Sequence, residues 1–307
     1  MMDTVLVTGG TGLVGRALTA FLIERGFKVI VLSRRKMASD HPQLEYARWD
    51  LDRKVLDTTA LRQADHIIHL AGANVAQGRW TGARKQEILN SRVQGSQLLH
   101  DHLRLHPNKV RKVISASATG YYGPYTGSIF TENDPAADDF LGTTCQAWEN
   151  SVRQMEELGK KVIILRTGLV MSLRGGALKE FYKPVKLGFA AVMGSGEQWV
   201  SWIHLQDLVR LYFNALVNDD LNGVYNAVAP HPATNHELVT SLARAAKGNS
   251  FVTLHVPAFA LKVALGEMSV EVLKSVKVSA GKILQTGFQF SYPTVAEAME
   301  QLLREKR

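Results

Sequence analysis

A glycine-rich stretch near the start of the chain constrains the fold more than any other feature. An apolar run at residues 5–7 ends in glycine, and a helical pattern of apolar positions follows at residues 13–25. Gly9, Gly12 and Gly15 therefore lie between an expected strand and an expected helix. Gly9 would permit a tight turn, Gly12 a close approach of the backbone to a diphosphate, and Gly15 close packing of the helix on the strand. The spacing predicts a dinucleotide-binding turn, with a glycine-rich turn that holds no ligand as the alternative.

The start of the expected helix gives a second reason to expect a phosphate ligand. The first N–H groups of a helix have no partner within the helix, and its dipole places positive potential at the same end. We therefore predict that the loop and the first helical turn bind a coenzyme. The residues expected to make these contacts are Gly9, Thr11, Gly12, Leu13, Val14 and Gly15.

Segments of strand length alternate with helical segments along most of the chain. Strands are expected at residues 29–32, 44–49, 66–70, 110–115, 162–165, 200–204 and 223–229, and helices at residues 56–63, 82–106, 143–158, 207–217, 235–247 and 259–265. Apolar strands that alternate with helices indicate a parallel sheet with both faces covered. The sequence thus predicts the α/β class, with a doubly wound parallel sheet, or Rossmann fold.

The pattern changes after residue 166, where glycines, prolines and mixed polar residues become frequent. We expect a dinucleotide-binding domain at residues 1–170, whose sheet is completed by residues 200–230. A smaller C-terminal substrate lobe is expected at residues 171–199 and 231–307.

The end of the second expected strand indicates which dinucleotide is bound. In this fold an acidic residue at that point binds the ribose hydroxyls of NAD. Here the strand ends in Ser33-Arg34-Arg35-Lys36, which offers a hydroxyl and cations but no carboxylate. Because arginine binds phosphate through a planar fork, Ser33 and Arg34 suit the 2′-phosphate of NADP. A solvated basic turn is the alternative.

Composition and charge narrow the class of protein further. The 307 residues are 46% apolar and 21% charged, as in ordinary globular proteins, and the net charge is +8. Lys and Arg are scattered, so we attribute this charge to anionic small molecules and expect neither a nucleic acid nor a membrane partner. Cys145 is the one cysteine, which suits a reducing compartment, and no apolar stretch resembles a signal peptide or a membrane span. We predict a cytoplasmic protein with a small-molecule substrate, and edge helices that would allow a homodimer.

Further motifs resemble those of the extended short-chain dehydrogenase/reductase superfamily, in the expected order. Besides the glycine loop, they are Asp50-Leu51, His69-Leu70-Ala71-Gly72, Arg166-Thr167-Gly168-Leu169-Val170, Gly194-Ser195-Gly196 and Trp202-Ile203-His204-Leu205-Gln206-Asp207-Leu208. The resemblance implies that Asp50 and Leu51 lie beside the adenine and that Leu70, Ala71 and Gly72 line the coenzyme. By position, Ser91 can reach the nicotinamide ribose, and Arg166 could bind a phosphate or a carboxylate, with an arginine paired to a nearby carboxylate as the alternative.

A narrower resemblance covers nearly the whole chain. The motifs that carry it are Arg79-Trp80, Ser117-Ala118-Thr119-Gly120-Tyr121-Tyr122-Gly123, Ala147-Trp148-Glu149, Gly175-Gly176 and Gly287-Phe288-Gln289-Phe290-Ser291-Tyr292-Pro293. They are similar to the sugar-nucleotide epimerase-like (YfcH-like) family, of the NAD(P)-dependent epimerase/dehydratase type, with its small C-terminal domain of unknown function. The resemblance implies NADP binding and leaves the reaction open.

The catalytic residues of the superfamily are only partly present. Its enzymes use a Tyr-x-x-x-Lys pair on a helix, in which the tyrosine exchanges a proton and the lysine lowers the tyrosine's pKa. At the corresponding positions this chain has Cys145 and Glu149, and a glutamate would raise a neighbouring acid's pKa. A literal match at residues 182–186 is rejected, because Pro184 would disrupt a helix there.

Replacement groups are available after the fifth expected strand. Ser117 takes the position of the residue that orients the substrate oxygen, and Ser115 is the nearby alternative as well as an expected coenzyme contact. Tyr122 and Tyr121 are the candidate proton donors, with rings that only wall the pocket as the alternative. Cys145 is expected to be a buried, inert thiol. His66, His69 and His204 lack metal-ligand spacing, so no metal site is expected.

Two functions remain after this reading of the sequence. The first is an NADP-dependent oxidoreductase or epimerase that acts on a hydroxyl or carbonyl compound, with a nucleotide sugar as one candidate. The second is a non-catalytic NADP-binding or redox-sensing protein, which the replacement of Tyr-x-x-x-Lys by Cys145 and Glu149 favours.

Overall fold

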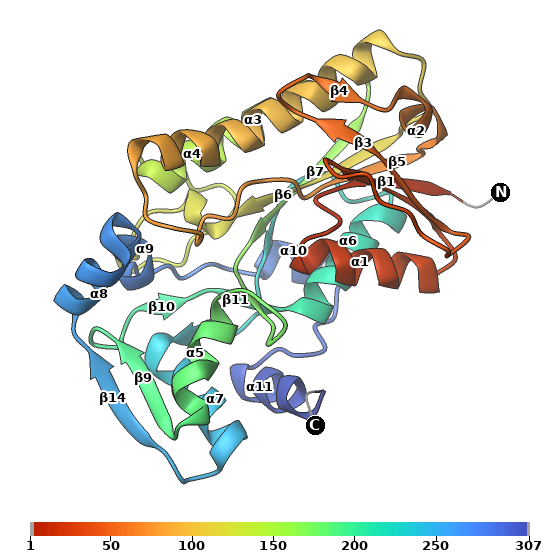
Figure 1. Ribbon diagram of the computed structural model, residues 1–307. Coiled ribbons are helices and arrows are strands. Elements are labelled where there is room, and N and C mark those ends of the chain that lie inside the picture. The colour runs from red at the N-terminus through yellow and green to blue at the C-terminus, as the bar shows by residue number, and fades with distance from the viewer. Residues whose placement is uncertain (1–2, 306–307) are drawn as a thin grey trace.

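A parallel sheet forms the centre of the protein, as the computed structural model shows for residues 3–305 (Figure 1). Its strands, in spatial order, are β12 (Gly223–Ala227), β7 (Lys161–Thr167), β6 (Lys112–Ala118), β5 (His66–His69), β1 (Thr4–Thr8), β2 (Lys28–Ser33), β3 (Leu44–Asp50) and β4 (Val55–Leu56). All neighbouring strands run parallel except β3 and β4. The predicted fold class, a doubly wound parallel sheet, is confirmed.

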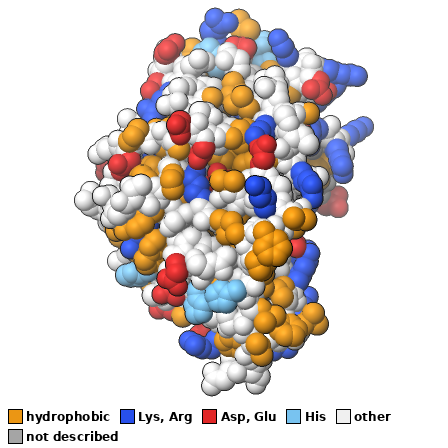
Figure 2. All heavy atoms as spheres, turned by 90° about the vertical axis from the view of Figure 1, so that its left-hand side faces the viewer, with side chains coloured by type: hydrophobic (Ala, Val, Ile, Leu, Met, Phe, Trp, Pro, Cys, Tyr) orange, Lys and Arg blue, Asp and Glu red, His pale blue; other side chains and the backbone are white. Residues whose placement is uncertain are grey.

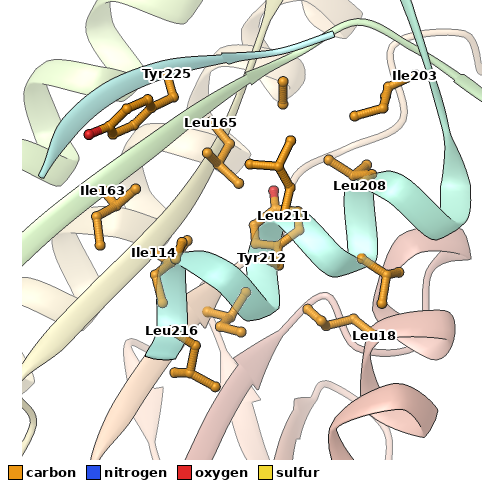
Figure 3. Packing of buried hydrophobic residues seen from close by; sticks show 14 of the residues in the cluster. Leu18, Ile114, Ile163, Leu165, Ile203, Leu208, Leu211, Tyr212, Leu216 and Tyr225 are labelled. Carbon is orange, nitrogen blue, oxygen red and sulfur yellow. The ribbon is translucent and has the colours of Figure 1, made fainter. Parts of the chain in front are cut away.

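Helices cover both faces of this sheet, as the apolar strands require. One face carries α1 (Leu13–Glu24) and α6 (Leu205–Val217), and the other carries α2 (Thr58–Gln63), α3 (Gly82–Leu105) and α4 (Phe140–Arg153). Figure 3 shows Leu211 and Tyr212 of α6 pointing towards Leu165 and Ile114 of the sheet. These contacts are fully buried, so the sheet fixes the positions of the loops at the carboxyl ends of its strands.

The carboxyl end of the sheet contains the point where the strand order reverses. β1 pairs with β2 on one side and with β5 on the other, and Thr8 lies opposite both Leu32 and His69. The chain leaves β1 and β5 in opposite directions, which opens a crevice between the loops that follow them. The glycine-rich loop lies at this crevice.

The expected completion of the sheet by residues 200–230 is right for one of its two strands. β12 joins the edge of the sheet beside β7, whereas β11 (Trp202–His204) pairs with β8 (Leu169–Met171) in a separate two-stranded sheet. Ala229 donates its N–H to the carbonyl of Trp202, so the start of β11 is still bonded to the chain that leaves β12.

A smaller lobe with its own core follows in the second half of the chain. Its helices are α5 (Ala177–Lys186), α7 (Asn235–Lys247), α8 (Ala258–Leu265), α9 (Ser269–Leu273), α10 (Gly281–Gln285) and α11 (Val295–Arg304), and its strands are β9 (Phe189–Met193), β10 (Trp199–Val200), β13 (Ala233–Thr234) and β14 (Val252–Val256). Leu178, Leu238 and Met299, from α5, α7 and α11, are fully buried against one another's helices. In Figure 1, α8 and α9 lie at the edge of this lobe, near the start of α3.

Helix α5 corrects the expectation about Pro184. The residue lies inside the helix, near its carboxyl end, where a missing N–H removes a single helical bond. Tyr182 and Lys186 consequently lie on one helical face, with the Lys186 ammonium 5.4 Å from the Tyr182 ring centroid. This helix belongs to the smaller lobe, and neither residue lines the cavity at the glycine loop.

Helix α4 begins earlier than expected. The Asp139 carboxylate accepts a hydrogen bond from the N–H of Gly142 at 2.8 Å and caps the helix, so that it starts at Phe140 and not at residue 143. The expected last turn is a separate 3-10 segment, Gln154–Leu158, which ends at Gly159 in the left-handed conformation. Both differences leave Cys145 and Glu149 on α4.

Positive charge is not concentrated in one patch on the face shown in Figure 2. Lys and Arg are interspersed there with acidic and hydrophobic side chains. Among residues 3–305, no helix is long and apolar enough to cross a membrane. The homodimer stays a prediction.

Candidate coenzyme and substrate site

The glycine loop has the close backbone contacts that its sequence predicts. Gly9 has φ +69°, and a Cβ there would lie 2.8 Å from the backbone of Leu70. A Cβ on Gly15 would lie 2.3 Å from the Gly9 carbonyl oxygen, so α1 packs on the loop at a distance that only glycine allows. Gly12 donates its N–H to the Gly9 carbonyl at 3.0 Å and closes the turn.

The first turn of α1 leaves its N–H groups available to a ligand. Gly12 is the N-cap and offers no side chain, and no acidic residue stands in the first turn. The positive end of the helix dipole therefore meets no protein carboxylate in this turn. This arrangement fits a diphosphate, which would accept hydrogen bonds from these groups.

A cavity of about 620 Å³ extends from this loop along the carboxyl ends of β1, β2 and β5. It brings together ten of the expected coenzyme contacts: Gly9, Thr11, Gly12, Ser33, Arg34, Leu51, Leu70, Ala71, Gly72 and Ser91. Six others do not line it: Leu13, Val14, Gly15, Asp50, Ser115 and Arg166. The cavity therefore contains most of the expected coenzyme contacts, and the assignment of these residues to a coenzyme stays a prediction.

Local contacts explain several of these departures. Leu13 packs against Gly175, and Ser115 is fully buried and donates to the Ala116 carbonyl at 3.0 Å. Asp50 accepts the backbone N–H of Arg53 at 3.1 Å and pairs with Arg48. The hydrogen bond from Arg53 contributes most to lowering the pKa of Asp50, which keeps the carboxylate charged at the end of β3.

A buried polar chain at the crevice holds the wall of the cavity, and sequence reasoning missed it. The Thr8 hydroxyl accepts the N–H groups of Leu70 and Ala71, each at 3.1 Å, and lies 2.7 Å from Nδ1 of His69. Its own proton therefore goes to Nδ1, and Nε2 of His69 donates to Ser96 at 3.3 Å. Burial lowers the pKa of His69 to about 4, so the ring is neutral and has both nitrogens bonded.

Ser91 supports the same wall from α3. Its hydroxyl accepts the N–H of Ala73 at 2.9 Å and donates to the Ile88 carbonyl at 3.0 Å. Ser91 lines the cavity as expected, and these bonds also hold the loop after β5 in place.

The rim beside β2 is strongly basic. Arg16, Arg34 and Arg35 all line the cavity, and no ion pair joins any of them to a carboxylate within residues 3–305. Ser33 accepts the N–H of Arg35 at 3.1 Å and so shapes the turn that carries these cations. Glu87, which also lines the cavity, is paired with Arg84 at 2.6 Å. The sequence identified Ser33 and Arg34, whereas Arg16 reaches the rim from α1 and was missed.

The expected catalytic residues lie in a closed cluster around Arg166. Its Nε and Nη2 donate to the two oxygens of Glu149 at 2.8 and 2.9 Å, and Ser117 donates to Glu149 at 2.7 Å. Tyr122 donates to Asn226 at 2.7 Å and accepts from Nη1 of Arg166 at 2.9 Å. Four stretches of chain meet here: β6 together with the turn that follows it, α4, β7 and β12.

Burial and charge make this cluster a structural one. The exposed fractions of Ser117, Arg166 and Tyr122 are 3%, 2% and 0%. Burial raises the pKa of Tyr122 to about 12, against the opposing charge of Arg166. Burial alone would lower the pKa of Arg166, but the ion pair with Glu149 raises it. The interpretations of Tyr122 as a proton donor and of Arg166 as an anion ligand therefore do not fit their surroundings, because both groups already have protein partners.

Tyr121 and Cys145 have different environments. Tyr121 is half-buried, and its ring lies 3.4 Å from the guanidinium carbon of Arg166. Cys145 is 4% exposed, and burial raises the pKa of its thiol to about 12. The expected burial of this thiol is confirmed, and Tyr121 alone among the three catalytic candidates is not buried.

Comparison with known proteins agrees with this geometry. Residues 5–227 match the model of the NAD dependent epimerase/dehydratase family, and residues 256–302 match a domain of unknown function, DUF1731. The chain belongs to the NAD dependent epimerase/dehydratase family. The expected membership of the extended short-chain dehydrogenase/reductase group is thereby confirmed.

Three similar proteins show how far the likeness extends. The "Epimerase family protein SSP1921" of Staphylococcus saprophyticus is 36% identical over 98% of this chain and 100% of its own length. The human epimerase family protein SDR39U1, solved with NADPH, has a TM-score of 0.86 and 29% identity, covering 98% of this chain and 99% of that one. A nucleoside-diphosphate sugar epimerase from Corynebacterium glutamicum has a TM-score of 0.76 and 30% identity, covering 98% of this chain and 58% of that one.

A second cavity in this protein, of about 440 Å³, lies away from the glycine loop. It is lined by parts of α1, α6 and α11, with Phe21, Val209 and Leu302 among its apolar residues. Its walls contain none of the residues expected to contact the coenzyme. The groups of His, Cys, Asp and Glu within residues 3–305 include no set of three or more that could hold a metal ion.

Proposed function

We propose that this chain binds NADP(H) in the 620 Å³ cavity, with the ribose 2′-phosphate at Ser33 and Arg34. The observation that carries the proposal is the rim of three arginines, Arg16, Arg34 and Arg35, without a carboxylate partner within residues 3–305. If the site bound NAD, a carboxylate at the end of β2 would be expected, where it would bind the ribose hydroxyls. The human relative solved with NADPH supports this assignment.

The protein's part in coenzyme binding follows from the same geometry. The α1 N-terminus and the glycine loop would hold the diphosphate, and the backbone of Leu70 and Ala71, fixed by Thr8, would border the ribose. NADP(H) supplies a hydride donor or acceptor when it is bound.

Titration of the intrinsic NADPH fluorescence tests the coenzyme assignment. The wild type should bind NADPH more tightly than NADH, and Arg34→Ala should weaken NADPH binding about tenfold, or about 1.4 kcal/mol, while leaving NADH binding unchanged. Arg53→Ala is the matched control, because Arg53 is exposed on the next strand connection and does not line the cavity. Equal affinities of the wild type for the two coenzymes, or an equal loss of both in Arg34→Ala, would contradict the proposal.

The proposed reaction is hydride transfer at a hydroxyl or carbonyl carbon of a small molecule, in an oxidoreductase or epimerase, with a nucleotide sugar as one candidate substrate. Family membership supports this class. Tyr121 is the proposed proton donor, since Ser117 and Tyr122 are occupied by Glu149 and Asn226. Ser117 and Tyr122 would act as positioning residues that hold the turn after β6.

Coenzyme turnover over a panel of carbonyl compounds and nucleotide sugars tests the reaction. Tyr121→Phe should abolish an identified turnover, whereas Tyr122→Phe should change stability more than kcat. A turnover that Tyr121→Phe leaves intact would refute the role of Tyr121.

A second function, NADP(H) binding without turnover, is favoured by the cluster itself. Glu149, at the position of the family's lysine, is committed to Arg166 and Ser117, and Cys145 stands where the tyrosine is expected. A binding or sensing protein would retain NADPH affinity and turn over no member of the panel. The raised pKa of Cys145, caused first by its burial, argues against this thiol as a redox sensor.

A further inference from the structure

Arg92 lies on α3 at the border between the coenzyme cavity and helix α4. Its guanidinium carbon is 5.0 Å from the Trp148 ring, and a Cβ on Gly72 would lie 3.2 Å from the same carbon. The side chain thus lies between an aromatic ring on α4 and the loop after β5. Gly72 lines the coenzyme cavity, so Arg92 lies beside this part of its wall.

The guanidinium uses only part of its hydrogen-bonding capacity. Nη1 donates to the carbonyls of Ala73 at 3.2 Å and Ile88 at 2.9 Å. Arginine has five N–H donors, and no described residue accepts a hydrogen bond from Nε or Nη2 of Arg92. Because two carbonyls fix Nη1, the remaining edge of the planar fork is held in one orientation.

The charge of Arg92 has no protein counterion within residues 3–305. No carboxylate lies within 4.0 Å of its nitrogens, although burial is sufficient to lower its pKa from the ordinary value. Arginine stays protonated in proteins, and a cation that is partly removed from water without an anion nearby is less well stabilised than a fully solvated one. Such a group is typical of a site that receives its counterion from a ligand.

The groups around Arg92 leave the local charge positive. Cys145 is a neutral thiol, and the neighbouring Glu149 is neutralised by its bidentate ion pair with Arg166. Arg84 adds a second cation in the vicinity, and it is paired with Glu87. His69, which also interacts electrostatically with Arg92, is neutral. Every acidic group near Arg92 is therefore already committed elsewhere.

We propose that Arg92 binds an oxyanion of the substrate, a carboxylate or a phosphate, beside the coenzyme. The proposal rests on the function proposed above, and it deepens it by assigning the substrate an anionic group at the position where the superfamily has its tyrosine. A carboxylate or phosphate fits the free edge of a guanidinium through two parallel hydrogen bonds. The coenzyme diphosphate is the other possible source of the anion, but the N-terminus of α1 already provides for it.

Anion titration with and without NADPH tests the proposal. Oxalate, malonate and inorganic phosphate are added at constant ionic strength, with chloride as the reference salt, and binding is followed by the melting temperature and by NADPH fluorescence. Wild type should bind at least one of these anions, and Arg92→Gln should weaken that binding tenfold or more, while NADPH affinity changes less than threefold. Arg92→Lys, which keeps the charge and most of the packing on Trp148, should retain part of the anion binding.

Arg153→Gln is the matched control, because Arg153 is a half-exposed arginine on α4 that should not affect anion binding. An equal loss of NADPH and anion binding in Arg92→Gln assigns Arg92 to the coenzyme and overturns the proposal. Wild-type protein that binds NADPH but none of the anions also overturns it and leaves the proposed function intact. Failure to bind NADPH refutes the proposed function, and titration without coenzyme then still decides whether Arg92 binds an oxyanion.

Discussion

Replacing Glu149 with glutamine should destabilise the protein strongly, although glutamine has nearly the same size. Glu149 and Arg166 are 2% exposed each, and two hydrogen bonds of 2.8 and 2.9 Å join them. In the variant, the guanidinium would remain buried without a counterion. Removing one partner of a buried ion pair costs about 3–5 kcal/mol, and because the amide oxygen still accepts one hydrogen bond, we expect about 3 kcal/mol. This is a large fraction of the ~5–15 kcal/mol that stabilises a typical folded domain.

Urea unfolding at pH 7, followed by tryptophan fluorescence and circular dichroism, measures this loss as a shift of the midpoint at constant slope. Arg153→Gln is the control, since its Nη2 lies 3.9 Å from the same carboxylate and its side chain is 46% exposed. Because Arg153 is solvated and only at the outer limit of an ion-pair distance, its replacement should cost about 0–1 kcal/mol.

A double replacement separates the uncompensated charge from simple loss of packing. Glu149→Leu with Arg166→Met removes both charges and should destabilise the protein less than Glu149→Gln alone, because no buried ion is left unpaired. A cost below about 1 kcal/mol for Glu149→Gln, or a double variant less stable than Glu149→Gln, would refute the assignment of this cluster as a buried structural ion pair.

Two further predictions concern the cavity wall. Burial lowers the pKa of His69 from 6.5 to about 4. As the pH falls, the unfolded chain therefore takes up a proton on this ring before the folded chain does. The contribution of neutral His69 to the free energy of unfolding is complete above pH 6.5 and is lost as the pH falls towards 4. Between pH 7 and pH 5 the wild type should lose about 2 kcal/mol more than His69→Gln, measured by urea midpoints, and equal losses would refute the neutral ring. Gly15→Ala would place a Cβ 2.3 Å from the Gly9 carbonyl oxygen and should weaken NADPH binding at least tenfold, whereas Gly82→Ala, with no atom within 4 Å, should leave it unchanged.

The fold and the glycine loop could be predicted because their signals are local. Gly9 is required by its own left-handed backbone, with φ +69°, and Gly15 by its contacts with Gly9 and Gly10, so their spacing carries the information. Ser33 and Arg34 follow directly from where β2 ends. The parallel sheet follows from the alternation of apolar strands and helices.

Interactions between distant segments account for what the sequence did not predict. Residues 200–204 look like a strand of the main sheet, but Val200 pairs with β13 and residues 202–204 pair with β8, because nothing in a single strand's composition specifies its neighbour. Pro184 is compatible with α5 because the helix ends two residues later. Thr8 and His69 are joined across 61 residues, and their hydrogen bond has no sequence pattern.

The catalytic residues show the same limit in its strongest form. Ser117 follows β6 as expected, but its hydroxyl donates to Glu149, which is 32 residues away along the chain. The motifs predict that Glu149 cannot replace a lysine, and the structure adds that Arg166 is the partner with which this glutamate is buried.

The coenzyme half and the chemical half of the site are therefore built by different means. Backbone atoms of the glycine loop and of Leu70 and Ala71 form the first, so its shape depends on where glycines are present and side chains are absent. Side chains from four separate segments form the second, and their charges cancel within the protein when Glu149 meets Arg166. With that pair closed, Arg92 is a partly buried cation beside the cavity, and Nε and Nη2 of its guanidinium have no acceptor among residues 3–305. Under the proposal made above, this guanidinium binds the anionic group of the substrate, and the proton transfer that the tyrosine and lysine perform elsewhere in the superfamily is assigned to Tyr121.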